Sequence, residues 1–115
     1  VDDDKSTLVM MRLLLSQDAC QVAGVLDATQ ALKVLKETRF DWLIVDGQIS
    51  PIDGFELSQK AKEIQPHIKI VMISGLYEPA DIVGRPIGKI FQKPVDTDRL
   101  MDYLRSGGAA TSPPA

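Results

Sequence analysis

One carboxylate stands where an apolar stretch of the sequence ends. The run Trp42-Leu43-Ile44-Val45 leads directly into Asp46, and a loop rich in Gly, Ser, Pro and Asp follows. A short continuous apolar run bounded by turn residues is typical of a strand buried on both faces, as in a parallel sheet. Asp46 would then lie at the carboxyl end of its strand, the edge where open α/β sheets bind ligands.

Other polar groups follow other predicted strands. Residues 68–73 form an apolar run that ends at Ser74, and residues 89–92 form a short one that ends at Lys93. The acids Asp2, Asp3 and Asp4 join this set if Val1 is the end of a strand. Because the loops that follow parallel strands share one edge of the sheet, we expect these side chains to gather around Asp46.

Such a group of side chains suits phosphoryl chemistry. A carboxylate such as Asp46 can attack a phosphorus centre and form an acyl phosphate. Two anions repel, and Mg²⁺ can bridge them through hard oxygen ligands; Asp3 and Asp46 can supply these, with Asp2 acting through a water. Lys93 can neutralise a phosphoryl oxygen as a point charge. A hydrogen bond from the Ser74 hydroxyl to the phosphoryl group would convert a local charge change into a shape change.

Alternating helices and strands must position these groups. The spacing of apolar residues predicts helices at 6–18, 28–38 and 54–64, and a last helix capped by Asp96. Strands are predicted at 21–26, 40–46, 68–73 and 89–92, and Gly24 weakens the first of them. Residues 76–87 contain two prolines and a glycine, which argues against a long helix there. This alternation predicts an α/β fold with a parallel sheet and right-handed crossovers.

Composition narrows the class of protein. The 115 residues suit one domain, which we place at 1–106, with a flexible tail or linker stub at 107–115. The net charge of −3 gives no electrostatic reason to bind nucleic acid or an anionic membrane. Cys20 is the only cysteine, which excludes an internal disulfide and fits a reducing, cytoplasmic compartment. No apolar stretch is long enough to span a bilayer.

The set of residues resembles the receiver domain of bacterial two-component response regulators, over roughly residues 1–106. The matching pieces, in order, are Asp2-Asp3, Asp46, Asp53-Gly54, Ser74-Gly75 and Lys93-Pro94. The resemblance implies a flavodoxin-like (βα)5 three-layer sandwich with parallel sheet order 2-1-3-4-5.

The same resemblance implies a function. Asp46 would be the phosphoacceptor, served by a histidine kinase or phosphotransfer protein, with Ser74 and Lys93 in the switch. Mg²⁺ would be the cofactor, held by Asp2, Asp3, Asp46 and the backbone carbonyl of Gln48. An output domain or a downstream protein would receive the signal, and the domain itself would not be an enzyme.

Three features depart from the family pattern. Only Val1 precedes the acids, so we expect that the first strand is largely missing from this sequence and that apolar residues precede Val1 in the native protein. Gly47 stands where a larger apolar residue is usual. The stretch from Ser74 to Lys93 is short, and the position of the usual switch aromatic falls at Ile90, with Phe91 expected to face the other way.

Two rival functions stay open. The altered stretch before Lys93 motivates a pseudo-receiver, a protein-interaction module that signals without phosphorylation. The other rival is a Mg²⁺-dependent hydrolase with Asp46 as nucleophile, which would need a second Asp as general acid and a substrate cap. Gly47-Gln48 offers no such acid, and the chain is too short for a cap. The acids at 2–4 could also be a plain solvated start.

Overall fold

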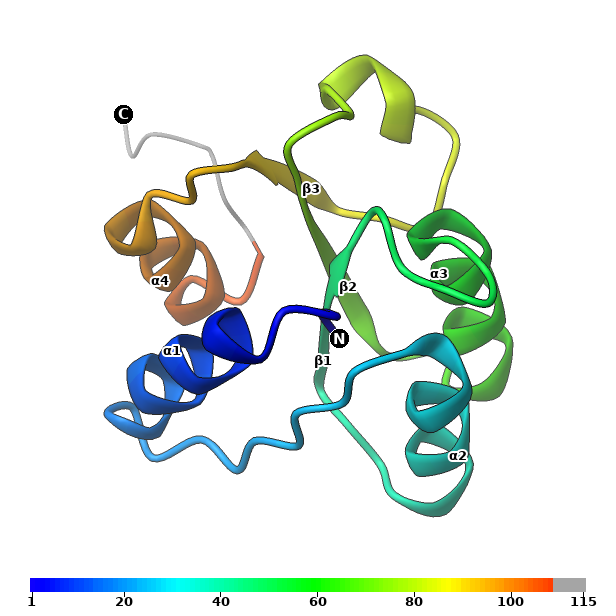
Figure 1. Ribbon diagram of the computed structural model, residues 1–115, viewed down its shortest axis with the longest axis horizontal. Coiled ribbons are helices and arrows are strands. Elements are labelled where there is room, and N and C mark those ends of the chain that lie inside the picture. Colours follow the sequence, from blue (N-terminus) through cyan, green and yellow to red (C-terminus); the bar gives the residue numbers. More distant parts are fainter. Residues whose placement is uncertain (109–115) are drawn as a thin grey trace.

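The computed structural model describes residues 1–108 and has three layers (Figure 1). A parallel sheet of three strands, in the order β1-β2-β3, lies between two pairs of helices. Helices α2 and α3 cover one face of the sheet, and α1 and α4 cover the other. The elements are α1 (Lys5–Ser16), α2 (Ala28–Glu37), β1 (Trp42–Asp46), α3 (Gly54–Ile64), β2 (Lys69–Ser74), the 3-10 helix η1 (Pro79–Ile82), β3 (Lys89–Gln92) and α4 (Thr97–Arg105).

The strand register brings the polar residues to one edge. Asp46 pairs with Ile73, one residue before Ser74, and Ser74 pairs with Gln92, one residue before Lys93. All three strands run in the same direction, so their carboxyl ends meet at a single edge. The predicted ends of the strands at 40–46, 68–73 and 89–92 are therefore confirmed to within a residue, and the site residues follow from them.

Each α-helix starts at an aspartate. The side chains of Asp4, Asp27, Asp53 and Asp96 accept hydrogen bonds from backbone N–H groups in the first turns of α1, α2, α3 and α4. A carboxylate at this position satisfies an otherwise unpaired donor and interacts favourably with the helix dipole. The predicted helices are confirmed, with bounds that shift by one or two residues.

The core is divided by the sheet. Alternate residues of β2 point to opposite faces: Met72 packs with α2 and α3, and Ile73 packs with α1 and α4. The same alternation separates Ile90 from Phe91, since Ile90 joins the α2–α3 side and Phe91 the α1–α4 side. The prediction that Phe91 faces away from the position of the usual switch aromatic is confirmed.

The predicted strand at 21–26 is wrong. These residues are irregular, and one backbone hydrogen bond joins them to Val1-Asp2: the N–H of Asp2 donates to the carbonyl of Val25, at 3.2 Å. Val1 also bonds to β1. Its nitrogen donates to Ile44 O at 2.7 Å, and its carbonyl accepts from Asp46 N at 2.9 Å. Val1-Asp2 thus occupies the place of the first strand in the order 2-1-3-4-5, but it is too short to give the 21–26 segment a full ladder.

A cavity of about 690 Å³ lies beside Val1. Its lining is largely apolar and includes Leu8 and Met11 of α1, Val25, Leu35 of α2, and Trp42 of β1. The cavity therefore lies among α1, the irregular segment 21–26, α2 and β1.

Gln65 fixes the entrance to β1. The buried amide donates from Nε2 to the carbonyls of Leu35 and Thr38, both at 2.7 Å, and its Oε1 accepts from Phe40 N at 2.8 Å. These three hydrogen bonds tie the end of α3 to the end of α2 and to the start of the strand that carries Asp46. Nothing in the sequence pattern indicated this role.

The remaining segments also bear on the predictions. Between β2 and β3 the only helix is the short η1, which confirms that no long helix forms there. Gly107 and Gly108 make a turn after α4 with positive φ angles of 71° and 79°; the rest of the predicted tail, 109–115, lies outside the described residues. Over residues 1–108, no helix has the length and apolar character needed to cross a membrane.

Candidate functional site

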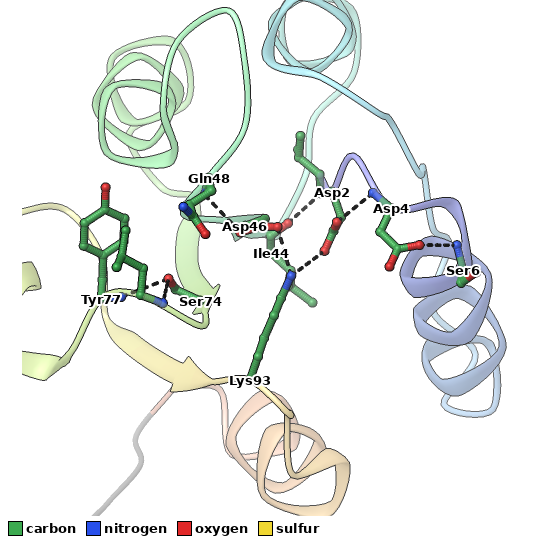
Figure 2. A network of polar contacts seen from close by, with 11 residues as sticks. Asp2, Asp4, Ser6, Ile44, Asp46, Gln48, Ser74, Tyr77 and Lys93 are labelled. Carbon is green, nitrogen blue, oxygen red and sulfur yellow. Dashed lines mark hydrogen bonds and ion pairs between the residues drawn. The ribbon is translucent and has the colours of Figure 1, made fainter.

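Asp46 and Lys93 form the centre of the site (Figure 2). Asp46 is buried, and its Oδ2 accepts a hydrogen bond from Lys93 Nζ at 3.0 Å. Its other oxygen, Oδ1, accepts from the backbone N–H of Gln48 at 3.0 Å. β1 presents the carboxylate and the residue after β3 presents the ammonium, so the parallel register alone brings them together.

Asp2 is the second buried acid of the site. Its Oδ2 lies 3.4 Å from Lys93 Nζ, and its Oδ1 accepts from the N–H of Asp4 at 2.9 Å. Burial raises the pKa of Asp2 above its ordinary value, and the negative charge of Asp46 adds to this effect. Partial burial would lower the pKa of Lys93, but its hydrogen bond with Asp46 and the charges of Asp2 and Asp46 together raise it.

Asp3 completes a cluster of three carboxylates. It is exposed, and one oxygen from each of Asp2, Asp3 and Asp46 can lie within 4.8 Å of the others. This donor set fits a hard divalent cation such as Mg²⁺, which takes one or two protein carboxylates and keeps several waters. The role of the Gln48 carbonyl as a further ligand stays a prediction. Asp4 points away, because its side chain caps α1 (Figure 2).

Ser74 lies at the end of β2 with its side chain fully buried. Its Oγ accepts hydrogen bonds from the N–H groups of Leu76 and Tyr77, at 3.0 and 3.1 Å. A hydroxyl that accepts two bonds still has its own proton to donate. The backbone carbonyl of Ser74 accepts from Lys93 N at 2.9 Å, which holds the ends of β2 and β3 together.

The loop after Asp46 folds back against it. Gly54 N donates to Gly47 O at 3.1 Å, and a Cβ added to Gly54 would lie 2.6 Å from the backbone oxygen of Asp46. Only glycine permits this approach. The Asp53-Gly54 pair therefore has two structural roles, since Asp53 caps α3 and Gly54 closes the loop.

Tyr77 is a residue that sequence reasoning missed. Its ring lies against Gly47, directly after Asp46, where a Cβ at position 47 would come within 2.8 Å of Tyr77 Cδ2. The signal was present in the sequence, because Gly47 stands where the family pattern has a larger side chain. The space left by that side chain is filled by Tyr77.

The fold and the site together define the class of protein to which this chain belongs. This is a flavodoxin-like α/β protein with an acidic, lysine-paired site at the carboxyl edge of its parallel sheet. The family model for the response regulator receiver domain matches residues 1–105, and the chain belongs to this family.

Relatives support the assignment. The chain is 24% identical over 109 residues to sporulation initiation phosphotransferase F of Bacillus subtilis, covering 91% of this chain and 87% of that protein. It is 26% identical over 106 residues to the autoinducer 1 sensor kinase/phosphatase LuxN of Vibrio campbellii. That match covers 90% of this chain but only 12% of LuxN, so the chain corresponds to a small part of that protein.

Solved structures show the same fold. The CheY-like response regulator receiver domain protein of Methanospirillum hungatei aligns with a TM-score of 0.85 at 21% identity, over 91% of this chain and 86% of that one. The BeF3-activated DrrB receiver domain aligns with a TM-score of 0.83 at 20% identity, over 92% and 91% of the two chains. The prediction of a flavodoxin-like receiver fold is confirmed.

Proposed function

We propose that this chain is a phosphoacceptor domain that takes a phosphoryl group on Asp46 and changes conformation through Ser74 and Lys93. The observation that carries the proposal is the position of Lys93 Nζ, 3.0 Å from Asp46 and 3.4 Å from Asp2. A cation placed between two buried acids can stabilise the negative charge that a phosphoryl group adds.

The transfer step needs one nucleophilic oxygen. Oδ1 of Asp46 accepts only the Gln48 N–H, and Oδ2 is held by Lys93. One of these oxygens attacks the phosphorus of a phosphohistidine, the P–N bond breaks with its electron pair left on the imidazole nitrogen, and an acyl phosphate forms on Asp46. Lys93 stays beside the product, where its charge neutralises a phosphoryl oxygen.

The three carboxylates would hold Mg²⁺. Asp2, Asp3 and Asp46 supply the donor set, and the bound ion would offset the repulsion between Asp46 and the incoming phosphoryl oxygens. Asp2 is kept in place by the Asp4 N–H and by the backbone bonds of Val1-Asp2 to Val25 and β1. These residues therefore pre-organise the acidic edge before any ligand binds.

We also propose partners and a cellular location for the domain. The donor would be a histidine kinase or a phosphotransfer protein, and the receiver of the signal an output domain or a downstream protein. The domain would act as a stoichiometric acceptor in the cytoplasm, with no turnover of an external substrate. No role in binding nucleic acid is proposed for it.

Intact mass spectrometry tests the proposal. After incubation with acetyl phosphate and Mg²⁺ the chain should gain one phosphoryl group, and the Asp46→Asn variant should gain none. Asp53→Asn is the matched control: Asp53 lies in the same loop, and asparagine also caps helices, so this variant should be modified like the parent. A folded parent that gains no mass would overturn the proposal and favour a pseudo-receiver that signals without phosphate.

A further inference from the structure

The ring of Tyr77 packs on a backbone that cannot move away from it. Gly47 is held on both sides, because its N–H donates to Ile73 O at 3.1 Å and its carbonyl accepts from Gly54 N at 3.1 Å. A Cβ at Gly47 would meet two ring atoms of Tyr77, Cδ2 at 2.8 Å and Cε2 at 3.2 Å. The ring therefore contacts the residue next to Asp46 at van der Waals distance.

The backbone of Tyr77 is attached to the Ser74 hydroxyl. Both Leu76 N and Tyr77 N donate to Ser74 Oγ, as Figure 2 shows. By contrast, the backbone of Ser74 itself is fixed through its carbonyl to Lys93 N. A rotation of the Ser74 side chain would thus disturb the loop that begins at Gly75 without moving the end of β2.

The Tyr77 ring also contacts a second aromatic ring. Phe55, in the first turn of α3, meets Tyr77 edge to face at 4.6 Å between ring centroids. The guanidinium of Arg85 lies 4.1 Å from the centroid of the same Phe55 ring. Tyr77 therefore links the Asp46 loop to the start of α3, and Phe55 in turn contacts Arg85 in the segment after η1.

The aromatic of β3 is not available for this role. Phe91 packs on the opposite face of the sheet, where its ring centroid lies 5.9 Å from that of Tyr103. Ile90, and not Phe91, faces the α3 side. Tyr77 is thus the aromatic residue whose backbone and ring contact both Ser74 and the residue after Asp46.

We propose that Tyr77 is the side chain that reports phosphorylation, leaving Gly47 and Phe55 when the Ser74 hydroxyl turns to donate to a phosphoryl group on Asp46. This inference rests on the proposed function. Turning Ser74 Oγ weakens its two bonds from the 76–77 backbone, and the fixed Gly47 gives the displaced ring no room to slide. The contact with Phe55 opens, so the changed surface lies at the start of α3 and along residues 75–85.

Fluorine NMR on protein labelled with fluorotyrosine tests this directly. The chain has two tyrosines, and Tyr103 lies on the opposite face of the sheet as an internal control. Beryllofluoride with Mg²⁺, a phosphoryl analogue, should shift the Tyr77 signal by more than its linewidth and leave Tyr103 unchanged. The signal is assigned with Tyr77→Phe, and Asp46→Asn should abolish the shift.

The bound analogue has its own fluorine signal, which separates two kinds of failure. If that signal appears while Tyr77 does not shift, the inference is wrong and the phosphoacceptor function stands. If no bound fluoride signal appears in the folded parent, the proposed function fails, and the inference fails with it.

A variant without any analogue gives a second test. Gly47→Ala places a Cβ against the ring and should move the Tyr77 signal toward its position in the analogue-bound parent. Gly75→Ala is the matched control, because its added Cβ would meet only Lys93 Cβ, at 3.9 Å. A Tyr77 signal in folded Gly47→Ala that stays at the analogue-free position would contradict the contact on which the inference depends.

Discussion

Lys93 Nζ lies 3.0 Å from Oδ2 of Asp46, although the two residues are 47 positions apart in the chain. The same ammonium is 3.4 Å from Asp2, which is 91 positions away. One cation therefore joins the start, the middle and the end of the domain. Since both acids are buried, this contact affects the free energy of unfolding as well as the chemistry of the site.

Removing the charge of Lys93 should destabilise the fold in a pH-dependent way. Lys93→Met leaves two buried carboxylates close together with no neighbouring cation, and we expect a loss of roughly 1–2 kcal/mol at neutral pH, less than for a fully buried pair because Lys93 is partly exposed. The loss should shrink at acidic pH, because burial raises the pKa of Asp2 and protonation of Asp2 removes one of the two negative charges. Urea unfolding at several pH values measures it.

The matched control for this change is Lys60→Met on the exposed side of α3. It removes one positive charge from the chain without touching the acidic edge. An equal loss of stability in both variants, or a loss for Lys93→Met that does not depend on pH, would contradict the role assigned to Lys93.

Asp2→Asn should stabilise the protein at neutral pH. Burial raises the pKa of Asp2 in the folded state, so the folded chain binds its proton more tightly than the unfolded chain. Stability must then fall as the pH rises from the unfolded pKa through the folded pKa, and the full cost is present above both. Asparagine removes this cost and keeps an oxygen for the Asp4 N–H.

The expected result is a higher denaturation midpoint than the parent at pH 7 and a difference that disappears near pH 3. Asp53→Asn, at an exposed helix cap, should show no comparable gain. A lower midpoint for Asp2→Asn at pH 7 would mean that its pairing with Lys93 outweighs the cost of its burial.

Mg²⁺ should raise the thermal unfolding midpoint of the parent. A ligand that binds only the folded state stabilises it by about 2.7 kcal/mol at a concentration 100 times its Kd. Asp3→Asn should lose this response, and because Asp3 is exposed its stability without metal should change by no more than roughly 0.5 kcal/mol. Asp4→Asn, beside it at the cap of α1, should respond like the parent. An unchanged response in Asp3→Asn would remove Asp3 from the ligand set.

Gly54→Ala should lower the free energy of unfolding. Its Cβ would lie 2.6 Å from the backbone oxygen of Asp46 and 2.9 Å from Gly47 Cα, and neither backbone atom can shift without moving the site. We expect a loss of roughly 1–3 kcal/mol in unfolding free energy. Gly75→Ala has room for its Cβ and should stay close to the parent. Equal midpoints for Gly54→Ala and the parent would show that the loop is not tightly closed on Asp46.

The sequence by itself determined the α/β class, three of the strands, the four helices and the edge at which Asp46, Ser74 and Lys93 meet. It could do so because these are local signals: apolar runs give strands, apolar residues at helical spacing give helices, and parallel strands must end at a common edge. It also indicated that Phe91 faces away from Ile90, because side chains alternate along a strand.

Only the tertiary structure decided the rest. Residues 21–26 have the composition of a strand but lack a ladder partner beyond Val1-Asp2, and hydrogen bonding between strands is not local. Three kinds of contact join residues distant in sequence: Asp2 pairs with Lys93, Gln65 bonds to the chain around Phe40, and Tyr77 contacts Gly47. The exposure of Asp3 likewise follows from the folded structure. Such contacts depend on how the helices pack on the sheet, and packing is set by the shapes of many side chains at once rather than by any short pattern.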